Sequence, residues 1–410
     1  MVKRSYIVGI DVGTAETRVG LGEPRPDGTV NIIGLGQSPS DGVRKGVIVD
    51  LEKTVESIVS AVEEAERMAG VKVDSAYVGL KGLNIELINN RGVVAVTAED
   101  REIREDDLDR VMQAARVVAL PMDREIVDII PREFIVDGFD GIRDPVGMLG
   151  VRLEVDALVV TSLITSLHNL LRCINRAGIS INGIVLQAMA NSEGTLSPDE
   201  RELGVFLIDI GAGTTEIALF QHGKLQKMAV VPIGGDHITT DLAAGLRINY
   251  HIAEELKKDY GSALQSLADS EPKIEIKTVG SNELRLVSER ELSGFIEPRV
   301  QEIFQITKEE MIKMGWPYLP PAGVVLRGGV SSMNGILEVA RQFFENDQVR
   351  VADFDLASVQ DPGYSTVIGL LYYVQRYQPR LYIQERGKPA RKRGPGLWQR
   401  LKDWMTDIID

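Results

Sequence analysis

The sequence is poor in the residues that build disulfides and metal sites. Cys173 is the only cysteine among 410 residues, which excludes a disulfide framework and a cluster of thiolate ligands. The four histidines are scattered and lack the spacing of metal ligands. We therefore expect Cys173 to be a small core residue and the histidines to be structural or surface residues.

Long apolar runs and an excess of positive charge are also missing. No apolar run is long enough to span a bilayer, and the first strand follows the N-terminus too closely for a signal peptide. The formal net charge of -14 argues against nucleic-acid binding. Neither GxxxxGKS nor GxxxxGKT occurs, so a Walker-type phosphate loop is excluded. These absences indicate a cytosolic protein of ordinary globular composition.

A strand followed by a glycine-rich turn lies near the middle of the chain. Residues 205–208 are apolar, as in a strand buried on both faces, and lead into Asp209. The turn then offers backbone N–H groups and hydroxyl donors that a phosphate can approach, from Gly211, Ala212, Gly213, Thr214 and Thr215. Residues 217–220 form the expected return strand, and Asp209 can hold hydrated Mg²⁺ beside the phosphates. Taken alone, the stretch fits a plain buried hairpin equally well.

The same pattern occurs near the N-terminus. An apolar strand over residues 6–10 leads into Asp11, a small-residue turn with Gly13 and Thr14 follows, and residues 18–22 return. Two copies this far apart predict two homologous half-molecules that face each other. Two hairpins that hold one polyphosphate from opposite sides are typical of the superfamily of actin, heat-shock chaperones and sugar kinases, which this chain resembles.

Two glycine pairs follow the second hairpin. Gly234 and Gly235 open a helix predicted to run to Leu246, and a helix N-terminus of this kind is a weak signal for a phosphate contact. Gly328 and Gly329 stand between a third apolar strand and another expected helix start. Both pairs are candidates for nucleotide-facing turns of the second lobe.

Three polar residues are further candidates. Gln187 ends a short predicted strand, where it either orders a water near the γ-phosphate or is simply a polar residue at a strand end. Glu254 and Lys257 lie one turn apart on a predicted helix, a spacing that is most often a solvated ion pair.

The segment from 82 to 160 differs from its surroundings in its predicted pattern of strands and helices. Residues 85–96 and 125–136 are predicted strands, and residues 106–118 a helix with acidic residues in its first turn. No catalytic constellation occurs in it. We expect an inserted α+β subdomain that serves interaction rather than chemistry.

The C-terminal 30 residues, 381–410, differ in composition from the rest of the chain. Residues 381–396 lose the hydrophobic pattern and carry basic residues together with proline and glycine, which predicts a flexible basic linker. Beyond it, apolar side chains recur at helical spacing on one face over residues 397–410, namely Leu397, Trp398, Leu401, Trp404, Met405 and Ile408. This pattern favours an amphipathic helix lying in a membrane interface over a helix docked on the protein.

Together these stretches resemble the FtsA family, the actin-like ATPases that tether FtsZ filaments to the bacterial membrane. The specific similarity lies in residues 40–46, 130–134, 144–152 and 199–204 and in the terminal tryptophan-bearing helix. The resemblance covers nearly the whole chain. It implies an α/β fold with two actin-like lobes, built from duplicated ribonuclease-H-like cores, with an inserted α+β subdomain and a C-terminal amphipathic helix.

The resemblance also implies roles for individual residues. ATP phosphates and Mg²⁺ would lie among Asp11, Gly13, Thr14, Asp209, Gly211, Gly213, Thr214 and Thr215. The ribose and adenine would be flanked by Glu254 and Lys257, with Gly328 and Gly329 on the adenosine side. Arg299 and Glu302 would lie on the helix that receives the FtsZ C-terminal peptide. Hydrolysis of ATP is expected to be slow.

The expected domain division follows the same resemblance. The first lobe comprises residues 1–81, 161–195 and 363–380, and the second lobe residues 196–362, with a nucleotide-capping subdomain at about 232–305. The expected partners are FtsZ, further copies of the chain, later division membrane proteins and anionic lipid at the cytoplasmic face of the septum. The alternatives are a pilus-assembly adaptor and a small-molecule kinase of the same superfamily, although no convincing general base for a kinase is present.

Overall fold

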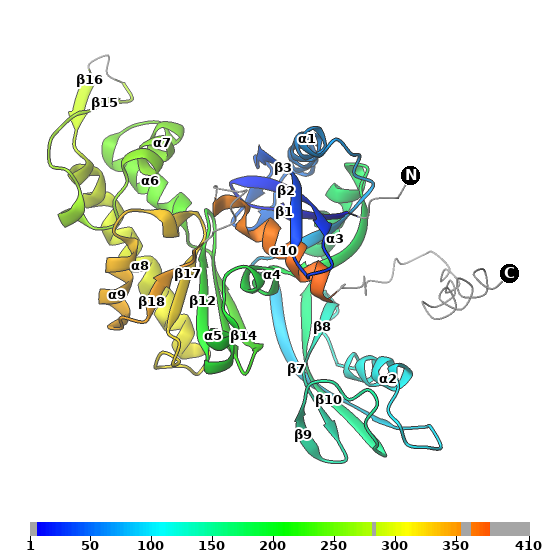
Figure 1. The fold of residues 1–410 in the computed structure, drawn as a ribbon. Helices are drawn as coiled ribbons and strands as arrows, with labels where there is room; N and C mark the ends of the chain where they lie inside the picture. The colour runs from blue at the N-terminus through cyan, green and yellow to red at the C-terminus, as the bar shows by residue number, and fades with distance from the viewer. Residues whose placement is uncertain (1–5, 281–283, 354–361, 378–410) are drawn as a thin grey trace.

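Each half of the protein is built on a five-stranded mixed sheet. The computed structural model describes residues 6–280, 284–353 and 362–377 (Figure 1). The strands of the first sheet stand in the order β11 (Ser180–Leu186), β6 (Ser75–Leu80), β1 (Ile7–Val12), β2 (Glu16–Pro24) and β3 (Val30–Pro39). Those of the second are β14 (Lys224–Val231), β13 (Thr215–Gln221), β12 (Val205–Ile210), β17 (Val324–Arg327) and β18 (Val349–Val351).

The two sheets share one topology. In both, the first hairpin strand pairs antiparallel with its return strand on one side and parallel with a later strand on the other. In the second sheet, Asp209 pairs with Glu216, and in the first Asp11 pairs with Arg18. The duplication predicted from the two sequence hairpins is therefore confirmed, and it places the two turns at equivalent sheet edges.

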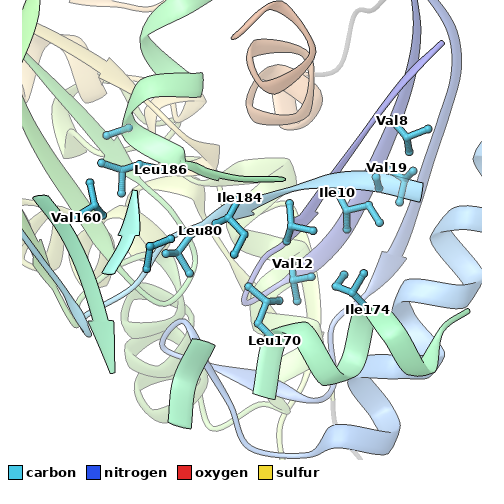
Figure 2. Packing of buried hydrophobic residues seen from close by; sticks show 14 of the residues in the cluster. Val8, Ile10, Val12, Val19, Leu80, Val160, Leu170, Ile174, Ile184 and Leu186 are labelled. Atoms are coloured by element: carbon cyan, nitrogen blue, oxygen red, sulfur yellow. The ribbon is translucent and has the colours of Figure 1, made fainter. Parts of the chain in front are cut away.

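Helices cover both faces of the first sheet. On one face lie α1 (Leu51–Ala69) and α3 (Ile164–Arg176), and Figure 2 shows Leu170 and Ile174 of α3 on the side of the sheet where Ile10 and Val12 lie. The side chain of Asp50 caps α1, and Gly70 ends it in the left-handed conformation.

The other face of the first sheet carries α10 (Ser365–Tyr377), together with α4 (Gln187–Glu193). Its approach depends on glycines, because a Cβ added at Gly20 would lie 2.3 Å from a methyl group of Val367. Helix α10 packs there against β1, β2 and α4. Because α4 leads from β11 toward the second sheet, it crosses between the two lobes (Figure 1).

The inserted subdomain is a separate layer below the first lobe (Figure 1). Its antiparallel sheet has the order β7 (Ile85–Ala95), β10 (Arg152–Leu163), β8 (Arg124–Val136) and β9 (Phe139–Ile142), with α2 (Glu105–Ala115) packed on it. The two predicted strands and the helix are present. The sequence interpretation missed β10, which lies between β7 and β8 and joins them into one sheet.

The remaining helices and short strands belong mainly to the second lobe. They are α5 (Pro198–Leu203), α6 (Gly235–Leu246), α7 (Tyr250–Tyr260), β15 (Ile274–Lys277), β16 (Leu284–Val287), α8 (Glu289–Lys313) and α9 (Ile336–Phe344). In the first lobe, β4 (Val43–Arg44) and β5 (Val47–Ile48) form a small hairpin. The helix expected directly after Gly328 is instead a 3₁₀ turn, Gly329–Ser332, and α9 begins only at Ile336.

Candidate functional site

The two predicted phosphate turns meet between the lobes. A Cβ added at Gly213 in the second turn would lie 2.9 Å from the side chain of Thr14 in the first. The β4–β5 hairpin closes on both, since the N–H of Gly46 donates to Thr14 Oγ1 at 3.0 Å and Lys45 Cα would lie 2.9 Å from the same added Cβ. The fold therefore brings together two turns that are about 200 residues apart in sequence.

Asp11, at the end of β1, is held by two side chains from the first lobe. The amide nitrogen of Gln187 donates to its Oδ1 at 2.9 Å, and the Lys81 ammonium lies 3.5 Å from the same oxygen. Gln187 is buried, so the structure places it against Asp11 rather than in open solvent. Lys81 was missed in the sequence because no motif marks it, although it directly follows β6.

Asp209, at the end of β12, has the corresponding arrangement in the second lobe. The amide nitrogen of Asn191 donates to its Oδ2 at 2.8 Å, and a guanidinium nitrogen of Arg327 lies 3.8 Å from that oxygen. Gln187 and Asn191 both belong to α4 and are one turn apart. The crossing helix thus contacts the aspartate of each hairpin.

Glu216 adds a third carboxyl group to the cluster. It is buried beside Asp209 in the β12–β13 register, and burial, reinforced by the charge of Asp209, raises its pKa to about 8. Lys81 and Arg327 oppose this rise. Glu216 directly follows Thr215 in the glycine-rich motif, but nothing in the motif distinguishes it from a surface residue of the return strand.

Several buried polar atoms around Asp209 have no hydrogen-bond partner within the described part of the chain. They are Glu216 Oε2, Asn191 Oδ1, and Nε and Nη1 of Arg327. Native proteins leave few such atoms, and those that occur often face a ligand, ion or water. Together with the adjoining glycine turns, these atoms fit a polar group such as hydrated Mg²⁺ with a phosphate.

The glycine pairs of the second lobe adjoin the same site. A Cβ at Gly234 would lie 2.4 Å from the carbonyl oxygen of Gly211, and a Cβ at Gly328 would lie 2.4 Å from Asp209 Oδ1. Gly328 also has a positive φ of 88°, so only glycine fits there without strain. Both pairs therefore lie against the turn that follows β12, and their contact with a nucleotide stays a prediction.

Glu254 and Lys257 of α7 are packed against the start of α6. The ammonium group of Lys257 contacts Glu254 Oε2 at 2.6 Å, Thr239 Oγ1 at 2.8 Å and the carbonyl of Gly235 at 3.2 Å. This is a partly buried network and not the solvated ion pair that the spacing alone favours.

The two threonines of the turn after β12 differ in their surroundings. Thr214 remains partly exposed, whereas the hydroxyl of buried Thr215 donates to the carbonyl of Ile233 at 2.8 Å.

No group of three or more His, Cys, Asp or Glu side chains with metal-binding geometry occurs in residues 6–280, 284–353 and 362–377. Asp11 and Asp209 come from opposite lobes. This arrangement is compatible with Mg²⁺, which keeps several waters and is bound through one or two carboxylates plus phosphates.

Arg299 and Glu302 form a separate polar site on α8. The guanidinium of Arg299 binds Asp241 of α6 through two nitrogens, at 2.5 and 3.0 Å, and also pairs with Glu302. Asp241 is the main reason that the pKa of Arg299 is raised. A pocket of about 350 Å³ adjoins them, lined by Asp241, Ala244, Gly294, Phe295, Pro298, Arg299 and Glu302.

The C-terminal predictions lie outside the described residues. This applies to the basic linker at 381–396 and to the amphipathic helix at 397–410, including Trp398 and Trp404. Among the helices that the structure describes, none has the length and apolar character needed to cross a bilayer.

Comparison with known proteins identifies the family. The family model described as "Cell division protein FtsA" matches residues 206–369, and "SHS2 domain inserted in FTSA" matches residues 82–161. The cell division protein FtsA of Bacillus subtilis is 46% identical over 376 residues, covering 92% of this chain and 85% of that protein. The chain belongs to the FtsA family of cell division proteins. The resemblance stated from the sequence motifs is therefore confirmed.

Solved structures agree on the fold. A PilM–PilN type IV pilus biogenesis complex matches with a TM-score of 0.63 at 15% identity, covering 90% of this chain and 98% of that one. MreB5 of Spiroplasma citri bound to ADP matches with a TM-score of 0.54 at 15% identity, covering 90% and 96%. These similarities establish the actin-like fold. The FtsA sequence match, in contrast, favours cell division over the pilus-assembly alternative.

Proposed function

We propose that this FtsA-family protein binds ATP, polymerises on the cytoplasmic face of the bacterial membrane at the septum, and tethers FtsZ filaments there. It would also recruit later division proteins through the inserted subdomain. The observation that carries the proposal is the pair of equivalent phosphate turns meeting across α4, in a chain of the FtsA family. Each part of the proposal rests on a different region of the molecule.

The proposal that the protein binds ATP rests on the residues between the lobes around Asp11 and Asp209. Backbone groups of the turns at Gly13, Gly211 and Gly213 would approach the phosphates, and Lys81 would supply positive charge from the first lobe. Asp11 and Asp209 would hold Mg²⁺ through water, and the ion would neutralise phosphate charge. The similarity to MreB5, a structure bound to ADP, supports nucleotide as the ligand. A role for Gln187 in positioning water stays a prediction.

The membrane part rests on the sequence of the tail. Burying the apolar face that includes Trp398 and Trp404 gains roughly 25 cal/mol per Å², and the cost of ordering the helix offsets much of this. The basic linker adds ~1 kcal/mol for each Lys or Arg near an anionic surface, an effect that salt screens. A single chain should therefore bind weakly, and a filament with many tails tightly. Polymerisation would then control attachment.

The partner part rests on the pocket beside Arg299. Its apolar lining and its guanidinium suit an extended acidic peptide with apolar side chains, such as the C-terminal peptide of FtsZ. Because Asp241 already binds Arg299, the peptide carboxylate would have to share or replace this partner.

A co-sedimentation assay with anionic liposomes, Mg·ATP and FtsZ tests the proposal. We expect Trp404→Glu to abolish sedimentation with liposomes and to leave ATP binding intact. The matched control is Gln399→Glu, which adds the same charge on the polar face of the predicted helix. A variant unable to polymerise should sediment less than the parent at equal total concentration. Equal sedimentation of Trp404→Glu and the parent would show that the terminal helix does not hold the membrane.

A further inference from the structure

A cleft of about 1230 Å³ separates the inserted subdomain from the rest of the protein. Its walls come mainly from α2, from β8, from the start of β14 and from the end of α10. The residues that matter for its chemistry are Glu105, Asp106, Leu108, Asp109, Met112, Asp128, Phe134, Lys224 and Tyr377. Figure 1 shows α10 ending next to the inserted subdomain.

The cleft carries an excess of negative charge. Glu105 and Asp106, in the first turn of α2, are exposed, and neither has a hydrogen-bond or ion-pair partner among the described residues. Two of the cations in the lining are already paired with carboxylates that are not part of it, since Arg110 binds Asp107 and Arg376 binds Glu193. Glu105 and Asp106 are therefore two carboxylates in the wall of the cleft that no cation of the described residues pairs with.

The same wall also offers apolar surface. Leu108 and Met112 lie one turn apart on α2, and both are only partly buried. Phe134 of β8 lies deeper in the cleft. A suitable occupant therefore has a short apolar stretch next to several positive charges.

The chain's own continuation has this composition. Tyr377, the last residue of α10, lines the cleft, and the tail begins directly after it. Leu381, Tyr382 and Ile383 are apolar, and a basic cluster follows, made of Arg386, Lys388, Arg391, Lys392 and Arg393, with Glu385 as the only acid of the linker. The nine residues from Tyr377 to Arg386 can span roughly 30 Å when fully extended. Such a short tether gives an effective concentration on the order of millimolar.

We propose that residues 380–393 dock in this cleft, with the apolar stretch against Leu108 and Met112 and the basic cluster against Glu105 and Asp106. The inference rests on the proposed membrane role of the tail, because the same basic residues cannot neutralise α2 and an anionic lipid surface at once. The cleft therefore competes with the membrane for the tail. Membrane attachment requires the linker to leave the cleft.

Distances measured in the full-length protein test the docking directly. Spin labels are attached at Gln113→Cys, on the exposed face of α2 in the cleft, and at Ala390→Cys in the linker. The native Cys173 is buried, and burial raises its thiol pKa to about 11, so it reacts little with the label. We expect a short, narrow distance distribution in the absence of vesicles and its loss on adding vesicles of phosphatidylglycerol. A broad distribution without vesicles would overturn the proposal and leave the cleft to another chain.

Charge reversal in the cleft provides the second test. Glu105→Lys with Asp106→Lys should abolish the narrow distribution and tighten vesicle binding. If the docked form outweighs the free form about tenfold, the apparent Kd for vesicles falls about tenfold. The control, Glu99→Lys with Asp140→Lys, makes the same charge change at exposed sites of the inserted subdomain that do not line the cleft. Equal effects of the two double variants would refute specific docking. Failure of Trp404→Glu to release vesicles would instead refute the membrane role, while the label distance would still decide the docking.

Discussion

Glu216 provides a sharp test of the electrostatics between the lobes. Its carboxyl group is buried beside Asp209, and its pKa is raised from the ordinary value of 4.5 to about 8. Between these two values the folded protein binds a proton that the unfolded chain does not bind. The stability contributed by this group is therefore fully present below pH 4.5 and is lost as the pH rises toward 8.

The variant Glu216→Gln keeps the shape of the protonated side chain but cannot ionise. A pKa rise from 4.5 to about 8 corresponds to about 5 kcal/mol, which sets the upper limit of the effect. We expect the variant to match the parent near pH 5 and to be more stable than the parent by several kcal/mol at pH 9. The difference should grow steadily across this window.

Urea unfolding at five pH values between 5 and 9 measures this difference, followed through the first unfolding transition and with EDTA present to remove divalent cations. The parent and the variant share all other titrating groups, so the difference between them isolates Glu216. The control Glu275→Gln alters an exposed carboxylate on β15. A stability difference for Glu216→Gln that stays constant with pH would refute the assignment of a buried, neutral carboxyl group at this position.

Two further predictions concern the binding sites. Asp209→Asn should weaken Mg·ATP binding strongly and leave binding measured without Mg²⁺ less affected, because it removes the magnesium-side carboxylate; equal affinities of variant and parent in calorimetric titrations with Mg²⁺ would contradict the site. Arg299→Glu should weaken binding of an acidic FtsZ-tail peptide by ~1–3 kcal/mol through loss of a charge-assisted contact, as measured by fluorescence anisotropy, with ATP binding unchanged. Unaltered peptide affinity would move that site away from α8.

The duplicated core could be predicted from sequence because its signals are local. An apolar strand, an aspartate and a small-residue turn occur within a dozen residues at Asp11 and again at Asp209. Strand β10 was missed for the opposite reason. Its residues pair with β7 and β8, and the most distant pair, Ser162 with Ile85, is 77 residues apart (162 − 85). Such long-range pairing leaves little mark on the strand's own sequence.

The residues that contact Asp11 and Asp209 could not be predicted from the sequence for the same reason. Lys81 directly follows β6, Asn191 lies on α4 and Arg327 on β17, and only the fold brings them to the two aspartates. No spacing rule connects them. Glu216 lies within the motif, but its neutral state depends on burial and on the charge of Asp209, and neither can be read from the sequence.

The contacts of α10 connect the interlobe site to the start of the tail. At its first turn, Arg327 donates to the hydroxyls of Ser365 and Thr366, at 2.6 and 3.0 Å, while another of its nitrogens lies near Asp209. At its last turn, Arg376 pairs at 3.2 Å with Glu193, the final residue of the crossing helix α4. Arg327, which lies near Asp209, therefore holds the start of α10. Glu193, two residues after Asn191 in the sequence, holds its end. Because Arg327 lies in the second sheet and α10 packs on the first, a rotation of one lobe against the other must change the contacts at the first turn of α10.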